Sequence, residues 1–132
     1  MDPRKEHDPP PSGVARYRFG DTEFTFVSDG PLHLGDPRQS YPGAPADVVA
    51  AFVARDGHAG GEFVLQQNCL VVKTPRHQVL VDTGTGADRL FGSTTGHLRA
   101  NLEAAGFALD AFTHVLITHP HADHVGGLVT DR

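Results

Sequence analysis

The most informative part of this chain is residues 118–127, which read Thr118-His119-Pro120-His121-Ala122-Asp123-His124-Val125-Gly126-Gly127. This stretch places three imidazoles and one carboxylate within six residues. Imidazole and carboxylate groups are common ligands of zinc and of other borderline divalent metals. Packing imidazoles together for a purely structural purpose desolvates polar groups that lack partners. The stretch therefore indicates a metal site.

The residues before this stretch predict a strand that leads into it. Residues 111–118 read AFTHVLIT, and such an apolar, β-branched run is typical of a buried strand. Pro120 removes a backbone donor and keeps His119 out of helical geometry. His119 and His121 can then point the same way, as residues two apart do on a strand.

A short helix is expected to begin at Asp123. His119 and His121 would then face one metal position, and Asp123 and His124 would face a second position near it. Gly126 and Gly127 would let the start of this helix pack tightly against the sheet.

Two motifs carry a resemblance to a known family. The pattern His-x-His-x-Asp-His followed by Gly-Gly resembles the signature of the metallo-β-lactamase superfamily, and Leu80-Val81-Asp82-Thr83-Gly84 resembles its upstream strand-end acidic motif. The resemblance implies an α+β fold, the metallo-β-lactamase-like αββα sandwich, in which mixed β-sheets with flanking helices form two similar halves. Residues 14–132 resemble the N-terminal half, and the C-terminal half is expected to be absent.

The resemblance also implies a role for each residue of the two motifs. His119 and His121 would bind the first metal ion, and Asp123 and His124 would bind the second. Asp123 would also take part in catalysis by orienting the attacking hydroxide. Asp82 would lie behind the ligands and brace the histidine loop. The implied cofactor is Zn²⁺, two ions per complete domain, with iron or manganese as alternatives.

The chain departs from the family pattern after His124. Members of the family use a later His on the first metal, a later Asp that bridges both metals and a last His on the second. No His follows His124, and Asp131 is the only later acid. The chain alone is therefore expected to be truncated and inactive.

The implied chemistry is hydrolysis of an ester, lactone, amide or phosphoester through a metal-bound hydroxide, which divalent metals generate at neutral pH. Residues 28–32 and the run from Asp82 to Gly106 resemble the methyl parathion hydrolase and lactonase-like branch, which implies a small-molecule substrate. One alternative is a non-hydrolytic iron member of the same fold, such as a persulfide dioxygenase or a diiron oxidoreductase. Another is a non-catalytic metal-binding remnant. A fold shared by many chemistries does not select among them.

Composition narrows the choice of partners. The net charge of −5 over 132 residues gives no electrostatic reason to expect nucleic acid. No apolar run is long enough for a membrane span, and the N-terminus has no apolar signal core, so a cytoplasmic location is expected. Cys69 is the single cysteine and is expected to be a small buried side chain. An apolar sheet face without its second layer predicts self-association.

The other elements are predicted from local patterns. Residues 1–13 are expected to be a disordered tail. A hairpin is expected over residues 14–19 and 22–28, strands over residues 62–74 and 78–82, and helices over residues 47–55 and 95–105. The intervening residues 32–46 and 83–94 are expected to be loops. Phe19, Phe24, Phe26 and Phe63 are expected in the core.

Overall fold

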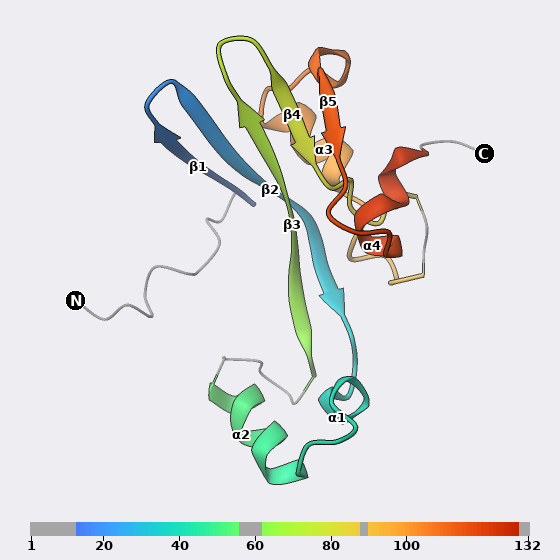
Figure 1. Cartoon of the computed structure of the whole chain (residues 1–132). Coiled ribbons are helices and arrows are strands. Elements are labelled where there is room, and N and C mark those ends of the chain that lie inside the picture. The colour runs from blue at the N-terminus through green and yellow to red at the C-terminus, as the bar shows by residue number, and fades with distance from the viewer. Residues whose placement is uncertain (1–12, 56–61, 88–89, 130–132) are drawn as a thin grey trace.

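The computed structural model describes residues 13–55, 62–87 and 90–129. These residues form a five-stranded mixed sheet in the order β1-β2-β3-β4-β5 (Figure 1). Neighbouring strands are antiparallel except β4 and β5, which are parallel. The α+β class predicted from the sequence is confirmed. The predicted disordered tail lies outside the described residues, apart from Gly13.

The predicted hairpin is present, but its second strand runs further than expected. Strand β1 (Val14–Phe19) pairs with the first half of β2 (Thr22–His33), and Gly20 occupies the left-handed region at the turn, with φ 59°. The expected end of β2 at Ser28 is wrong. A β-bulge between Ser28 and Gly30 shifts the register, and β2 then continues beyond the reach of β1, where an edge strand tolerates Pro31.

Strands β3 (Val64–Lys73) and β4 (Gln78–Val81) form at the expected places. They pair as an antiparallel hairpin from Lys73↔Gln78 to Leu70↔Val81. Asp82, predicted as the last strand residue, instead follows β4 in the left-handed region, with φ 62°. At this turn the chain leaves the sheet, directly after β4.

The segment between β2 and β3 holds two helices at the far end of the β2–β3 ribbon (Figure 1). Helix α1 (Pro37–Ser40) lies within a predicted loop. It begins where Asp36 accepts a hydrogen bond from the Arg38 N–H at 2.9 Å and Pro37 occupies the first helical position. Helix α2 (Ala46–Arg55) confirms the predicted helix and buries Val49 and Val53. No helix in the described part of the chain has the length and apolar character that a membrane crossing requires.

Helix α3 (Leu98–Ala104) covers one face of the sheet and closes the core. Its expected start at Thr95 is wrong, because Gly96 adopts φ 83° and interrupts the helical path. Leu98 and Leu102 project from α3 into the core against the sheet. The core lies between these elements and is made of Val27, Cys69, Val71, Leu80, Leu98, Leu102 and Phe107.

The C-terminal segment contains a short 3₁₀ turn η3 (Leu109–Ala111), strand β5 (His114–Leu116), helix α4 (Ala122–Val125) and a 3₁₀ turn η4 (Gly126–Leu128). The prediction that this strand is buried is wrong, since Val115 and Leu116 are 47% and 51% exposed. β5 pairs only with β4 and forms the edge of the sheet. Leu116 lies on the sheet face opposite α3, whereas Val115 lies beside Leu80 on the α3 side and is only partly covered there.

The sheet face opposite α3 is apolar and open. Two cross-strand rows lie on it by register: Ala15, Phe26, Leu70, Val81 and Leu116, and next to them Tyr17, Phe24, Val72, Val79 and His114. None of these residues is fully buried. Phe63 is buried as predicted, but Phe19 and Phe26 are 84% and 41% exposed. The prediction that Phe26 lies in the core is wrong, because no described element covers its face of the sheet.

Candidate metal centre

The predicted ligands gather at the carboxyl ends of the two parallel strands, β4 and β5. The Asp82 N–H donates to the Leu116 carbonyl at 2.8 Å, and the Thr83 N–H donates to the His124 carbonyl at 2.8 Å. These bonds place residues 82–83 beside residues 116–124, and Figure 1 shows α4 lying against the ends of both strands. The carboxyl ends of parallel strands are where α/β proteins commonly bind ligands.

All four predicted metal ligands lie in one cluster. His119 Nε2 is 3.0 Å from His121 Nδ1, and the ring centroids of His119 and His124 are 4.0 Å apart. The second pair is adjacent, with His124 Nε2 3.3 Å from Asp123 Oδ2. His119 and His121 are exposed, whereas Asp123 and His124 are partly buried. The extended turn and the short helix expected from residues 118–127 are both present.

The donor chemistry of this cluster suits zinc, which prefers imidazole nitrogen and carboxylate oxygen. The described side chains are nevertheless not arranged around one point: no group of three or more His, Cys, Asp and Glu among them is placed to hold a metal ion. The two nitrogens of His119 and His121 lie at hydrogen-bond distance, closer than the roughly 3.3 Å between two nitrogens on one tetrahedral zinc. The metal roles of the four residues stay predictions.

Asp82 contacts both segments of the cluster. Its Oδ1 accepts from the Thr118 N–H at 2.8 Å, and its Oδ2 accepts from His124 Nδ1 at 2.8 Å. Burial acts to raise the pKa of Asp82, but the hydrogen bonds from Thr118 and His124 outweigh it and hold that pKa below its usual value. An ionised carboxylate only accepts, so Nδ1 of His124 carries the proton and Nε2 keeps its lone pair for a metal.

Three residues that the sequence did not single out complete the support of the cluster. Thr118 Oγ1 lies 2.9 Å from Asp82 Oδ2 and 3.1 Å from His119 Nδ1. Gln67 and Thr83 donate to backbone carbonyls of α4. One signal was visible for Gln67, because its position shares a strand face with Cys69 and Val71, where a polar residue needs a partner.

Asp29 organises the loops behind the cluster and was also missed. Its fully buried carboxylate accepts from the N–H groups of Thr85, Gly96 and Leu98 at 2.9, 3.1 and 2.9 Å, and from Thr85 Oγ1 at 3.0 Å. It thereby joins the bulge of β2 to the start of α3 and to the loop after β4. The resemblance of residues 28–32 to the methyl parathion hydrolase and lactonase-like branch suggested no role for this carboxylate.

The two glycines after His124 permit the close packing that the sequence predicted, although the surface they meet is the loop after β4. A Cβ on Gly126 would overlap the Thr85 carbonyl, and one on Gly127 would overlap the Thr83 carbonyl. The backbone of the chain after α4 therefore lies directly on residues 83–85.

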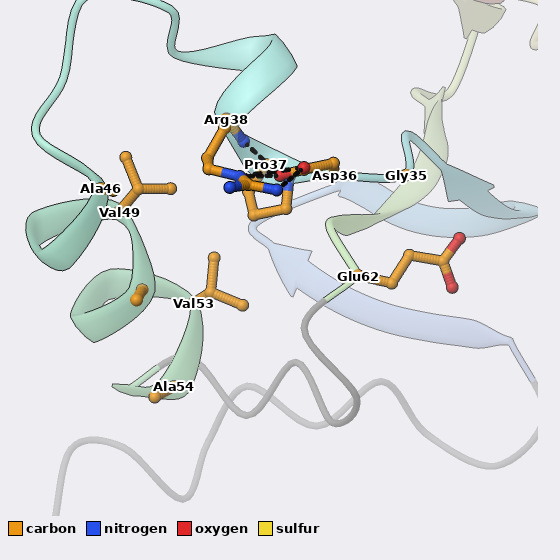
Figure 2. Close-up of a pocket in the computed structure, with 10 residues that line it drawn as sticks. Gly35, Asp36, Pro37, Arg38, Ala46, Val49, Val53, Ala54 and Glu62 are labelled. Atoms are coloured by element: carbon orange, nitrogen blue, oxygen red, sulfur yellow. Dashed lines mark hydrogen bonds and ion pairs between the residues drawn. The ribbon is translucent and has the colours of Figure 1, made fainter.

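Two cavities among the described residues differ in their distance from the histidine cluster. One of about 710 Å³ lies between α1 and α2. Figure 2 shows Val49 and Val53 on one side of it, with the paired Asp36 and Arg38 on the other. It lies at the end of the β2–β3 ribbon that carries α1 and α2, away from α4 (Figure 1), so it is not part of the histidine cluster. A second cavity of about 380 Å³ is mostly apolar and reaches Thr83 and Gly127.

Comparison with known proteins identifies relatives of this arrangement. The family model of the metallo-beta-lactamase superfamily matches residues 63–130. A lactamase-like protein of Pestalotiopsis microspora is 38% identical over 73 residues, which is 54% of this chain and 21% of that protein. An atrochrysone carboxyl ACP thioesterase of Aspergillus fumigatus is 39% identical over 70 residues, which is 52% of this chain and 15% of that protein.

Solved structures share the fold. The dizinc quorum-quenching lactonase AidC superposes with a TM-score of 0.80 and 28% identity, over 90% of this chain and 40% of that one. The hydrolase AbOPH of the beta lactamase superfamily gives a TM-score of 0.70 and 26% identity, over 90% of this chain and 40% of that one. The chain thus spans less than half the length of these relatives. With the family model covering residues 63–130 and the fold shared, the chain belongs to the metallo-beta-lactamase superfamily.

Proposed function

We propose that this chain carries part of the active site of a metal-dependent hydrolase that uses two zinc ions. The observation that carries the proposal is the cluster of His119, His121, Asp123 and His124 at the carboxyl ends of β4 and β5. These side chains come from a turn and a helix that have little core to form, since His119 and His121 are exposed. A metal ion gives such a group of polar side chains a common partner.

The residues divide into two pairs in the proposed site. His119 and His121 hold the first ion, and Asp123 and His124 hold the second. Zinc ions, when bound, would activate a water molecule and polarise the carbonyl or phosphoryl oxygen of the substrate. Asp123 orients the attacking oxygen, and Asp82 keeps the His124 ring in the tautomer that leaves Nε2 free.

The proposed substrate class is a small ester, lactone or thioester, with a phosphoester as the alternative. The structural relative AidC is described as a lactonase, and the Aspergillus fumigatus relative is described as a thioesterase. Both names imply attack on an acyl carbonyl, so the acyl ester is the shared chemistry that best supports the proposal.

Residues 1–132 alone are expected to bind zinc weakly. Two protein ligands per ion fall short of the three that a catalytic zinc usually takes. Zinc calorimetry on the purified chain tests this proposal. Binding should be measurable, His119→Ala should abolish most of it, and His77→Ala, which removes an exposed histidine elsewhere, should leave it unchanged.

Zinc binding that His119→Ala does not alter would contradict the proposed site. Two sites of nanomolar affinity per monomer would contradict the expected incompleteness of the ligand set, unless a dimer supplies the missing ligands.

Activity gives an independent test. In a longer chain that carries the later ligands, His119→Ala or Asp123→Asn should abolish hydrolysis while the fold persists. Residues 1–132 alone should not turn over a lactone, an aryl ester or an organophosphate ester. Zinc-dependent hydrolysis by this chain, lost in His119→Ala, would show instead that two copies build a complete site.

A further inference from the structure

We propose that Gln67 and Thr83 are positioning residues that hold the backbone of α4, and so set the direction in which Asp123 and His124 face a metal ion. Gln67 lies on β3, and Thr83 lies in the turn that follows β4. This inference rests on the proposed function, because it concerns ligands of the proposed second ion.

Helix α4 depends on outside donors because it has only four residues. The last carbonyls of a helix have no intrahelical partner. Gly126 N–H satisfies the Ala122 carbonyl. The next two carbonyls belong to Asp123 and His124, and their donors come from β3 and from the turn after β4.

The hydrogen bonds that these two carbonyls accept are short. Gln67 Nε2 donates to the Asp123 carbonyl at 2.7 Å. Thr83 donates twice to the His124 carbonyl, from its N–H at 2.8 Å and from Oγ1 at 3.0 Å. Gln67 and Thr83 are 8% and 6% exposed, so water competes little for these bonds.

The geometry also explains why a polar side chain occupies position 67. The face it shares with Cys69 and Val71 is part of the core, where an apolar side chain packs without a polar cost. The amide of Gln67 instead spans 56 residues of sequence to reach α4. This hydrogen bond holds the segment that carries Asp123 and His124.

Together with Asp82 these residues constrain His124 from two sides. Asp82 binds Nδ1 of the ring, while Thr83 holds the backbone carbonyl of the same residue. Loss of the backbone anchors would let α4 shift, and the ring would then leave Asp82 for part of the time. Residues that orient metal ligands in this way commonly change metal affinity 10–100-fold when they are replaced.

The test uses shape-matched variants of the 132-residue chain. Gln67→Met and Thr83→Val remove the side-chain donors, whereas Thr83→Ser retains its hydroxyl. Gln66→Met is the control on the same strand, at an exposed position. The first readout is the ¹H–¹⁵N two-bond NMR spectrum of the metal-free imidazoles, which reports the tautomer of His124. The second is the affinity for Co²⁺, followed by its visible absorption.

The chain, Gln66→Met and Thr83→Ser should show His124 in the Nδ1–H tautomer. Gln67→Met and Thr83→Val should show mixed tautomers and about 10-fold weaker Co²⁺ binding. Unchanged His124 signals in both donor-free variants would overturn the proposal, even if Co²⁺ binds well. Failure of the unaltered chain to bind Co²⁺ would count against the proposed function, while the imidazole spectra would still decide the positioning roles. If Gln67→Met does not fold, the Thr83→Val and Thr83→Ser pair decides.

Discussion

At the scale of single residues, Asp82 combines a backbone constraint with a hydrogen-bonding role. Its φ of 62° lies in the left-handed region, which Asp and Asn tolerate better than other residues with a Cβ. Its carboxylate accepts hydrogen bonds from Thr118, 36 residues later in the sequence, and from His124, 42 residues later. A strand-end acid was predicted to brace this loop, and Asp82 makes hydrogen bonds with Thr118 and His124 that agree with that role, which stays a prediction.

Replacement of Asp82 should separate these two functions. Asp82→Asn keeps a residue that tolerates the left-handed region but loses the charged acceptor, which should cost about 1–3 kcal/mol in the free energy of unfolding. Asp82→Ala should cost roughly 1 kcal/mol more because of the backbone conformation. Urea denaturation measures both, with Asp110→Ala as an exposed control. Equal losses in the two Asp82 variants would show that the backbone conformation carries no cost.

Cys69 should be chemically inert in the folded chain. Burial, with the nearby charges of Asp29 and Asp82, raises the pKa of its thiol to about 12, so the reactive thiolate is scarce. A thiol reagent at pH 8 should react with Cys69 only after denaturation. Fast labelling of the native protein would contradict the buried position.

The same raised pKa predicts a dependence of stability on pH. The folded chain keeps the Cys69 proton more tightly than the unfolded chain, whose thiol has a pKa near 9.0. The associated stability is complete below about pH 9 and declines as the pH rises toward 12. Urea denaturation at pH 8 and pH 10.5 should show a smaller decline for Cys69→Ala than for the unaltered chain. An equal decline in both would refute this linkage.

At the scale of elements, α4 is held by its surroundings rather than by its own length. Four residues are too few for an independent helix, and Gln67, Thr83 and the close approach of Gly127 to the loop after β4 supply the missing support. The sequence predicted the helix and the close packing of the two glycines that follow it. It did not identify the partner of Gln67, since a bond across 56 residues leaves no local pattern.

Gly127→Ala should disturb this element. Its new Cβ would overlap the Thr83 carbonyl, and relief requires α4 to move away from residues that anchor it. We expect a loss of about 1–3 kcal/mol in the free energy of unfolding, together with weaker zinc binding. Gly43→Ala is the matched control, because a Cβ there meets nothing within 4 Å. Comparable effects of the two substitutions would contradict a specific contact at Gly127.

At the scale of the whole molecule, the described elements cover one face of the sheet and leave the other face open. Helix α3 buries Val27, Cys69 and Val71 on the first. The second presents two apolar cross-strand rows that include Phe26 and Leu116, which are 41% and 51% exposed. Large contiguous apolar surfaces commonly become interaction sites or promote aggregation.

The described chain is therefore expected to self-associate through the open face. Sedimentation velocity should show association that increases with concentration, and Leu116→Lys should reduce it. Val48→Lys, at an exposed position on α2, is the control and should have little effect. A monodisperse monomer with a sharp two-state melt would refute this prediction, because it would show that the core closes without a partner.

Much of the local structure was predictable from the sequence alone. The metal motif, the hairpins, α2 and the strand leading to the motif follow from residue spacing, periodicity and turn residues, all of which act over a few positions. The family and the α+β class follow from the same short patterns.

The tertiary structure alone decided which polar groups meet and which apolar groups stay open. Asp29 contacts Leu98 across 69 residues, and Gln67 reaches α4 across 56. The sequence predicted Phe26 in the core, but whether its face of β2 is covered depends on packing against other elements. Local patterns state what a segment can form and which face is apolar, whereas hydrogen-bond partners and burial depend on segments that are distant in the chain.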